Sequence, residues 1–278
     1  MNDMIKLLAV DLDDTLLSEE LTIPDDNKRA LTAAMNAGIK VILASGRTFF
    51  SMEKYAAELG MSGREGYMIC SNGSSVYEMR TGNAVYTKTV PADAAAEAWN
   101  IVKRYSLTMQ YYGHGVIYSS GTNSYTDRDC RFTGQRLECI DDFDKALEGE
   151  QAKFVIPGDP DLLADVEREL KSALSGRCNI FVSKPYFLEI LPGDADKATA
   201  LAYVAESYGF FRGEVMAVGD SMNDLGMITW AGTGVAMSNG IEEVRMRADD
   251  VTQLTNDEGG VAWAVDKYIL SPVTAAET

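Results

Sequence analysis

Acidic residues stand at two points of this chain where an apolar segment ends. The first group, Asp11 and Asp13, follows the apolar run 5–10. In an extended backbone, residues two apart project to the same side, so we expect both carboxylates to face one point. Two such anions repel one another unless a cation or a proton joins them. A hard divalent ion with oxygen ligands, most simply Mg²⁺, would satisfy the pair.

The second acidic group lies within 219–224 and follows the apolar run 214–218. Asp220 stands at the tip of the expected strand, where it could complete a metal site with the first group. Asn223 can hydrogen-bond a phosphate oxygen or orient a ligand. Asp224 lies at the N-terminus of the next helix and is expected to hold a lysine or an outer-shell water. In isolation, the same residue types would also fit a helix cap and a turn.

Two further segments could bind an anion. Ser45, Gly46 and Arg47 follow an apolar run and open a helix, where a hydroxyl, free backbone N–H groups and the positive end of the helix dipole meet. Ordinary turn chemistry explains the same residues, and Arg47 is interpreted as structural. Lys197 begins another helix beside two aspartates, a setting typical of a solvated surface charge. Lys197 indicates a functional role only because it follows the other polar segments in a particular order along the chain.

The segments around these residues alternate between apolar runs and amphipathic stretches. This pattern predicts an α/β fold with a doubly wound, mostly parallel, Rossmann-like sheet, in which ligands bind beyond the carboxyl ends of the strands. From residue 84 to residue 191 the pattern changes to hairpins and an α+β order, so an inserted domain is expected there, with 1–83 and 192–278 forming the core. The expected strands are 5–10, 39–44, 67–70, 76–79, 84–86, 108–112, 116–119, 153–156, 179–183, 187–191, 214–218 and 234–236. The expected helices are 25–37, 48–59, 92–105, 161–174, 196–208, one after 224, 241–247 and 257–269, and the polar stretch 120–152 is expected to be irregular.

Composition limits the function further. The chain has 278 residues and a formal charge of −17, which argues against partnership with nucleic acids or anionic membranes. A small phosphate ester could still bind through a metal and a local cation. No apolar run reaches membrane-spanning length and no leader pattern opens the chain, so a cytoplasmic location is expected. The single histidine, His114, excludes a multi-histidine zinc site and is expected in a hairpin turn, either solvated or touching a substrate.

The ordered segments resemble the haloacid dehalogenase superfamily, and within it the Cof-type phosphatases, which insert a large α/β cap between the second and third motifs. The resemblance covers nearly the whole chain. Asp14 replaces the glycine that is usual in the first motif, and Asp196 and Ala198 flank Lys197 where the subgroup commonly has serine and glycine. The matching segments are 11–17, 45–47, 72–73, Lys197, 219–224, 231–237, Asn256 and 259–262.

The resemblance implies a role for each acid. Asp11 would attack phosphorus and become an aspartyl-phosphate, while Asp13 would protonate the leaving oxygen and later deprotonate the hydrolytic water. Mg²⁺ would be held by the side chains of Asp11 and Asp220, by the backbone carbonyl of Asp13 and by waters. Asp224 would act behind these ligands.

The resemblance also implies a phosphate-binding set and a role for the insert. The transferring oxygens would be bound by Ser45, by the N–H groups of Leu12 and Gly46, by Lys197 and by Asn223, since phosphoryl transfer depends chiefly on positioning and charge stabilisation. The inserted cap would close over the leaving group and set specificity.

Three functions remain open from the sequence. The leading hypothesis is a Mg²⁺-dependent phosphatase for a small phosphomonoester, with sugar phosphates ahead of pyridoxal or flavin-related phosphates. A phosphomutase would use the same aspartyl-phosphate. A phosphoacceptor signalling or binding module would share the acid pair and the lysine but would not need a large insert. The residues do not reveal the substrate or the oligomeric state.

Overall fold

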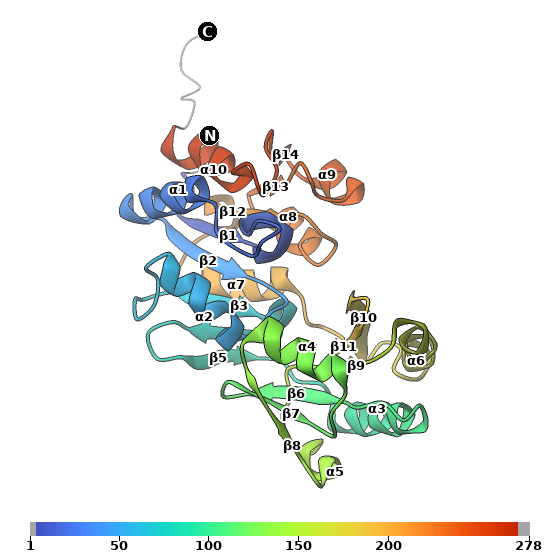
Figure 1. Cartoon of the computed structure of the whole chain (residues 1–278). Coiled ribbons are helices and arrows are strands. Elements are labelled where there is room, and N and C mark those ends of the chain that lie inside the picture. The colour runs from blue at the N-terminus through green and yellow to red at the C-terminus, as the bar shows by residue number, and fades with distance from the viewer. Residues whose placement is uncertain (1–3, 272–278) are drawn as a thin grey trace. The chain divides into compact units, whose positions relative to one another are not determined.

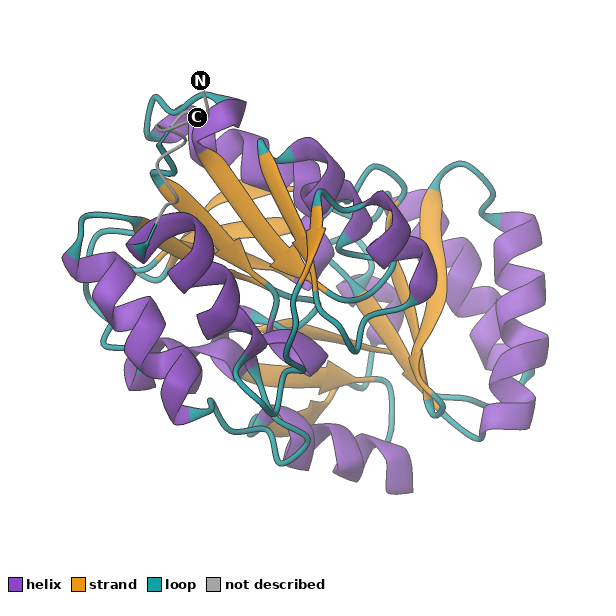
Figure 2. Ribbon diagram, turned by 90° about the horizontal axis from the view of Figure 1, so that it is seen from above, coloured by secondary structure: helices purple, strands orange, loops and turns teal. Residues whose placement is uncertain are grey.

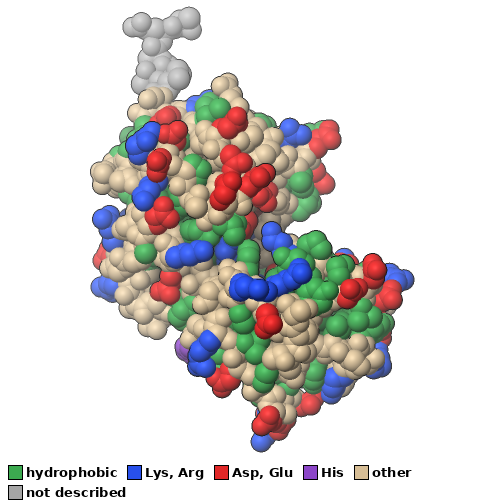
Figure 3. Space-filling view, viewed as in Figure 1, with side chains coloured by type: hydrophobic (Ala, Val, Ile, Leu, Met, Phe, Trp, Pro, Cys, Tyr) green, Lys and Arg blue, Asp and Glu red, His purple; other side chains and the backbone are tan. Residues whose placement is uncertain are grey.

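The computed structural model describes residues 4–271, which fold as two compact units (Figure 1). The first unit comprises the chain up to Gly46, Glu53–Val85 and the chain from Asp196 onward. The second unit comprises Arg47–Met52 and Tyr86–Ala195. None of the helices in the described part of the chain combines the length and apolar character needed to cross a membrane. In the face shown in Figure 3, acidic side chains are visible on both units, as the formal charge of −17 leads one to expect.

Within residues 4–271, the first unit is built on an eight-stranded sheet of order β14-β13-β12-β1-β2-β3-β4-β5. The strands from β14 to β3 run parallel, and β4 pairs antiparallel with β3. The bounds are β1 (Leu7–Val10), β2 (Lys40–Ala44), β3 (Tyr67–Cys70), β4 (Ser75–Glu78), β5 (Asn83–Thr87), β12 (Val215–Gly219), β13 (Thr233–Ala236) and β14 (Asp250–Val251). The prediction of a doubly wound, mostly parallel sheet is confirmed.

The two central strands show why the sequence specifies this sheet. Every residue of β1 and of β12 is buried, because helices cover both faces of a parallel sheet. Leu8 lies opposite Val41 of β2 on one side and Met216 of β12 on the other. The apolar residues of three neighbouring strands therefore lie side by side in register. Such strands appear in a sequence as continuous hydrophobic segments, the pattern that predicts them here.

Helices pack on both faces of the first unit's sheet (Figure 2). Helix α1 packs beside α10, and α7 packs beside α8. The helix predicted over 257–269 is shorter than expected, because Gly259 adopts a left-handed φ of 92° and the chain enters α10 only at the next residue, continuing as a π-helical turn over Asp266–Leu270. The bounds are α1 (Asp25–Asn36), α2 (Phe49–Glu58), α7 (Lys197–Ser207), α8 (Leu225–Trp230), α9 (Glu242–Arg247) and α10 (Gly260–Val265).

The second unit has a six-stranded sheet of order β10-β11-β9-β6-β7-β8 in the described residues. Its pairings are antiparallel except for that of β7 with β8. Helices α3 and α6 pack together, and their apolar side chains form one core with one face of the sheet. The bounds are α3 (Ala92–Arg104), β6 (Gln110–Gly113), β7 (Val116–Ser119), α4 (Ser124–Thr133), β8 (Arg136–Cys139), α5 (Phe143–Ala146), β9 (Phe154–Pro157), α6 (Pro160–Ala173), β10 (Cys178–Lys184) and β11 (Phe187–Pro192). The expectation of an α+β insert is confirmed.

The stretch 120–152 is not irregular, contrary to the prediction. It contains α4, β8 and α5. Helix α4 is mostly polar, so it lacks the apolar periodicity by which a helix is recognised. Its ends are instead fixed locally. The Asn123 side chain accepts hydrogen bonds from the N–H groups of Tyr125 and Thr126, and Gly134 ends the helix in a left-handed conformation.

Candidate active site

The predicted site residues lie at the carboxyl edge of the first unit's sheet. Asp11 follows β1, Ser45 follows β2 and Asp220 follows β12. From β1 the chain proceeds through β2 and β3 on one side, whereas β12, β13 and β14 occupy the other side. The strand order therefore reverses between β1 and β12, and ligands of open α/β sheets bind at such a reversal.

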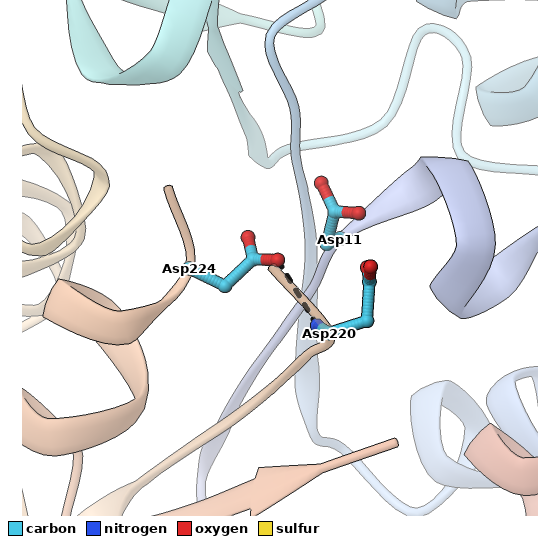
Figure 4. A group of neighbouring side chains, drawn as sticks. All are labelled: Asp11, Asp220 and Asp224. Carbon is cyan, nitrogen blue, oxygen red and sulfur yellow. Dashed lines mark hydrogen bonds between the residues drawn. The ribbon is translucent and has the colours of Figure 1, made fainter. Parts of the chain in front are cut away.

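Three buried carboxylates meet at this point. Asp11, Asp220 and Asp224 each contribute an oxygen, and these oxygens all lie within 4.8 Å of one another. Figure 4 shows the three side chains converging from β1, from the end of β12 and from the turn before α8. The ammonium of Lys197, the first residue of α7, donates to Asp11 Oδ1 and to Asp224 Oδ1, each at 2.6 Å. We call these four side chains the acid cluster.

The electrostatics of the acid cluster reflect an excess of carboxylates over cations. Burial, reinforced by the charge of Asp224, raises the pKa of Asp11 well above its usual range. The same two causes raise the pKa of Asp220 to about 6. Burial disfavours the ammonium form of Lys197, but the carboxylates of Asp11 and Asp224 outweigh it and raise the pKa of the lysine. The lysine is therefore charged at neutral pH, and its single charge is shared between Asp11 and Asp224.

Asp224 organises the cluster with both of its oxygens. Oδ1 accepts from Lys197, while Oδ2 accepts from the N–H groups of Asp220 and Ser221 at 3.0 Å each. Gly219 leaves room for this arrangement, because a Cβ there would lie 2.5 Å from the Asp224 side chain. With both oxygens engaged, Asp224 holds the turn and the lysine in place.

Asp220 is oriented by two hydroxyl groups. Its Oδ1 accepts from Thr15 Oγ1 at 2.7 Å, and its Oδ2 accepts from Ser221 Oγ. Sequence reasoning did not assign a role to Thr15, although it stands in the first acidic segment. Carboxylate oxygens carry two lone pairs each, so these hydrogen bonds leave Asp220 able to bind a cation.

The loop after β1 is anchored by amides from distant parts of the chain. The Asn239 side chain donates to the carbonyl of Asp14 at 2.7 Å, and the Asn256 side chain donates to the carbonyl of Leu17 at 2.8 Å. Asp14 has a φ of 60°, a left-handed conformation that aspartate tolerates better than most residues. A glycine would also accept this conformation. Leu12 and Asp13 lie in the same loop, with Leu12 buried and Asp13 half-buried.

Ser45 and Gly46 form the edge of the site beyond β2. Ser45 is buried, and its N–H donates to the carbonyl of Ile69 at 2.9 Å, which prolongs the pairing of β2 with β3. Arg47 belongs to the second unit, where its guanidinium lies 4.3 Å from the centroid of the Phe132 ring. Gly46 is therefore the last residue of this segment that belongs to the first unit.

The remaining predicted residues lie in different places. Asn223 is exposed and donates from Nδ2 to Asn72 Oδ1 at 3.0 Å. Lys197 is fully buried and not a solvated surface charge, and Asp196 caps its helix by accepting from the N–H of Ala198. His114 is exposed in the turn between β6 and β7 of the second unit, within the predicted hairpin.

The donor set of the acid cluster fits a hard divalent cation. Its oxygens come from side chains that are almost fully buried, and burial together with the charge of Asp224 raises the pKa values of Asp11 and Asp220, an effect that a bound cation would offset. A carboxylate-rich site of this kind suits Mg²⁺. Asp224 accepts from the Lys197 ammonium and from two backbone N–H groups, whereas each oxygen of Asp220 accepts from one hydroxyl group only, so Asp11 and Asp220 are the side chains best placed to hold such an ion.

Comparison with known proteins gives consistent matches over nearly the whole chain. The family model described as haloacid dehalogenase-like hydrolase matches residues 8–265. The 5-amino-6-(5-phospho-D-ribitylamino)uracil phosphatase YcsE of Bacillus subtilis (strain 168) is 32% identical over 266 residues, covering 96% of each protein.

Solved structures give the same result. A haloacid dehalogenase-like hydrolase from Bacteroides thetaiotaomicron superposes with a TM-score of 0.87 at 35% identity and covers 94% of this chain and 98% of its own. The protein TM0651 from Thermotoga maritima superposes with a TM-score of 0.84 at 28% identity, with coverage of 95% and 97%.

Proposed function

This chain belongs to the haloacid dehalogenase-like hydrolase family and is a phosphatase of that family, and from this premise we propose that it hydrolyses small phosphomonoesters through an aspartyl-phosphate on Asp11. The observation that carries the proposal is the acid cluster at the reversal of strand order. One oxygen of Asp11 is held by Lys197, which leaves the other to act as the nucleophile.

The reaction then proceeds in two displacements. Asp11 attacks phosphorus, a new bond forms between its oxygen and phosphorus, and the ester bond to the leaving oxygen breaks. Asp13 gives its proton to that leaving oxygen. A water then attacks the phosphoryl group, Asp13 takes a proton from the water, and inorganic phosphate leaves with Asp11 restored.

Mg²⁺ fits the acid cluster and would be held by the side chains of Asp11 and Asp220 and by the backbone carbonyl of Asp13. When bound, it lowers the repulsion between the anionic nucleophile and the anionic phosphate. Lys197 contributes a fixed positive charge on the other side of Asp11, and Asp224 keeps that charge in place. These contacts support the assignment because they orient the nucleophile before any substrate arrives.

The transferring oxygens would be bound by groups at the edge of the same sheet. Ser45 would donate its hydroxyl, Leu12 and Gly46 would donate backbone N–H groups, and Asn223 would donate its amide. Each sits at or beside the carboxyl end of a strand, where the phosphate must lie to reach Asp11.

We propose that the two units divide the work. The first unit carries the acid cluster, so a catalytic core of 1–83 and 192–278 is proposed. The inserted part, 84–191, would exclude water and select the leaving group. Sugar phosphates are the proposed substrate class, and the protein would act on such a small metabolite in the cytoplasm. The name of YcsE supports a polyhydroxylated leaving group, since that relative is a phosphatase for a 5-phospho-D-ribitylamino compound.

The proposal is tested with p-nitrophenyl phosphate and Mg²⁺. Wild type is expected to release phosphate, and Asp11→Asn is expected to lose turnover because the amide is a poor nucleophile. Asp14→Asn is the matched control: it makes the same change in the same loop at an exposed acid, and asparagine accepts its left-handed backbone. Equal turnover by wild type and Asp11→Asn would refute the proposal.

Product analysis separates the alternatives. A phosphomutase would isomerise a labelled hexose phosphate without releasing inorganic phosphate. A phosphoacceptor module would keep a long-lived acyl-phosphate after treatment with acetyl phosphate and would show no turnover. Steady release of phosphate from several sugar phosphates is the result expected here.

A further inference from the structure

The turn that follows β3 has an unusual backbone. Ser71, Asn72 and Gly73 have φ values of 51°, 54° and 87°, so three consecutive residues adopt left-handed conformations. Two of them are not glycine, and such residues keep this conformation only where their surroundings hold them. The turn lies at the same carboxyl edge of the sheet as the acid cluster.

The turn is packed against its neighbours on two sides. The N–H of Asn72 donates to the carbonyl of Ser45 at 3.0 Å. The Asn72 amide lies directly against Gly46, since a Cβ on that glycine would be 3.1 Å from both Nδ2 and Oδ1. On the other side, a Cβ on Gly73 would lie 2.2 Å from the carbonyl oxygen of Asp196, so the turn also abuts the start of α7.

Asn223 depends on this turn for its position. Its side chain is exposed, and Nδ2 donates to Asn72 Oδ1 at 3.0 Å, across 151 residues of sequence. An exposed amide without such an anchor samples several rotamers, and ordering it on phosphate binding costs entropy. The second N–H of the same Nδ2 remains available to another acceptor.

We propose that Asn72 is a positioning residue for the phosphate site: it fixes the Asn223 amide beside the loop formed by Ser45 and Gly46, so that the second N–H of Asn223 faces the phosphate. The inference rests on the proposed function, because it assumes that Asn223 binds phosphate. Asparagine suits the position for two reasons. It tolerates a left-handed φ, and its amide oxygen supplies an uncharged acceptor that does not repel the phosphate.

A double-mutant cycle on p-nitrophenyl phosphate tests the proposal. Asn72→Gly removes the amide and keeps the left-handed backbone, and Asn223→Ala removes the positioned donor. Each is expected to lower kcat/KM about tenfold, the effect of losing one hydrogen bond to a charged group. The double variant is expected to be no worse than Asn223→Ala alone, because Asn72 acts through Asn223.

Inhibition by vanadate gives a readout that does not depend on turnover, and the affinity for vanadate should follow the same non-additive pattern. Ser106→Gly, an exposed left-handed position in the second unit, controls for placing glycine at such a site and should keep wild-type kcat/KM and vanadate affinity. Wild-type kcat/KM in Asn72→Gly, or losses that multiply in the double variant, would overturn the positioning role while leaving the phosphatase proposal intact. A wild type that neither hydrolyses the ester nor binds vanadate would refute both proposals.

Discussion

Each unit of this protein buries a cluster of ionisable side chains, and the two clusters are balanced differently. The acid cluster of the first unit sets three carboxylates against one lysine. In the second unit, Lys153 pairs with Glu189 at 3.2 Å, and Asp129 accepts from the hydroxyl of Tyr112 at 2.6 Å and from the amide of Gln110. We call these five residues the second-unit cluster.

The second-unit cluster lies on the face of its sheet opposite α3 and α6. Residues two apart on a strand share a face, so Gln110 and Tyr112 point away from the core in which Tyr111 packs. Burial raises the pKa of Asp129, and the Tyr112 hydroxyl opposes this rise by donating to the carboxylate. In this cluster each carboxylate has donors of its own.

The two clusters therefore have different roles. The second-unit cluster stabilises the fold, whereas the acid cluster is arranged for chemistry. Buried charges with matched partners stabilise a fold only when their geometry is well satisfied, as it is for Lys153 with Glu189. The acid cluster keeps unneutralised carboxylates at a point where ligands enter, which costs stability but creates a site that attracts a cation and positions a nucleophile. The same substitution should therefore abolish catalysis in the first unit and affect only stability in the second.

Lys197→Met should have the largest effect on activity. It removes the cation that orients Asp11, and the loss of one such stabilising group lowers kcat by about a thousandfold. Methionine has a similar length, so no cavity forms at this buried position, but Asp11 and Asp224 lose their cation and the variant should also lose stability, so kcat is measured on the folded fraction. Steady-state kinetics on p-nitrophenyl phosphate with Mg²⁺ measure the effect. Retention of more than about a tenth of wild-type kcat, far above that estimate, would show that the lysine is structural.

Lys153→Met makes the same change in the second-unit cluster and should lower stability without lowering kcat. It leaves Glu189 buried without its cation, which lowers the free energy of unfolding by about 4 kcal/mol. Urea denaturation measures this loss. Turnover of p-nitrophenyl phosphate by the folded fraction should stay near wild type. A large fall in kcat with an unchanged free energy of unfolding would show that Lys153 serves catalysis and not stability.

Lowering the pH should stabilise the acid cluster in the metal-free protein. The pKa of Asp220 is raised to about 6, so the folded state holds its proton more tightly than the unfolded chain does. Because the unfolded pKa is 3.8, the stability of wild type relative to Asp220→Asn should rise as the pH falls from about 6 to about 4, by about 3 kcal/mol in total. Denaturation with a chelator present at several pH values measures this. A relative stability that falls over the same range would contradict the account.

Mg²⁺ should stabilise the wild type through the acid cluster only. At about a hundred times its Kd, a ligand that binds only the folded state adds about 2.7 kcal/mol. Thermal unfolding with and without Mg²⁺ should show this gain in wild type and in Asp129→Asn. It should disappear in Asp220→Asn. A gain that survives in Asp220→Asn would place the cation elsewhere.

The elements that can be predicted from the sequence are those in which the pattern of apolar residues matches the residues that are buried in the fold. Strands β1 and β12 were recognisable because all their residues are buried and apolar. Helix α4 was not recognisable, because it is polar and depends on its capping residues. Strand β14 has only two residues, too few to form a pattern.

The site was predictable to the extent that its residues stand at strand ends. Asp11 and Asp220 could be brought together by reasoning about parallel strands, since those strands end at one edge. The contacts of Thr15 with Asp220 and of Asn72 with Asn223 were missed because they join residues 205 and 151 positions apart. Such contacts depend on the three-dimensional path of loops, which composition and periodicity do not encode.

The most direct test of the central claim is to trap the covalent intermediate. Asp13→Asn should accumulate it from p-nitrophenyl phosphate, because p-nitrophenolate leaves without an acid, so the bond from Asp11 to phosphorus still forms while the base that activates the hydrolytic water is missing. The protein is mixed with substrate and Mg²⁺, quenched in acid, digested and analysed by mass spectrometry. We predict one phosphoryl group on the peptide that contains Asp11, labile to hydroxylamine. An unmodified Asp11 peptide, or a phosphoryl group on another residue, would contradict the account.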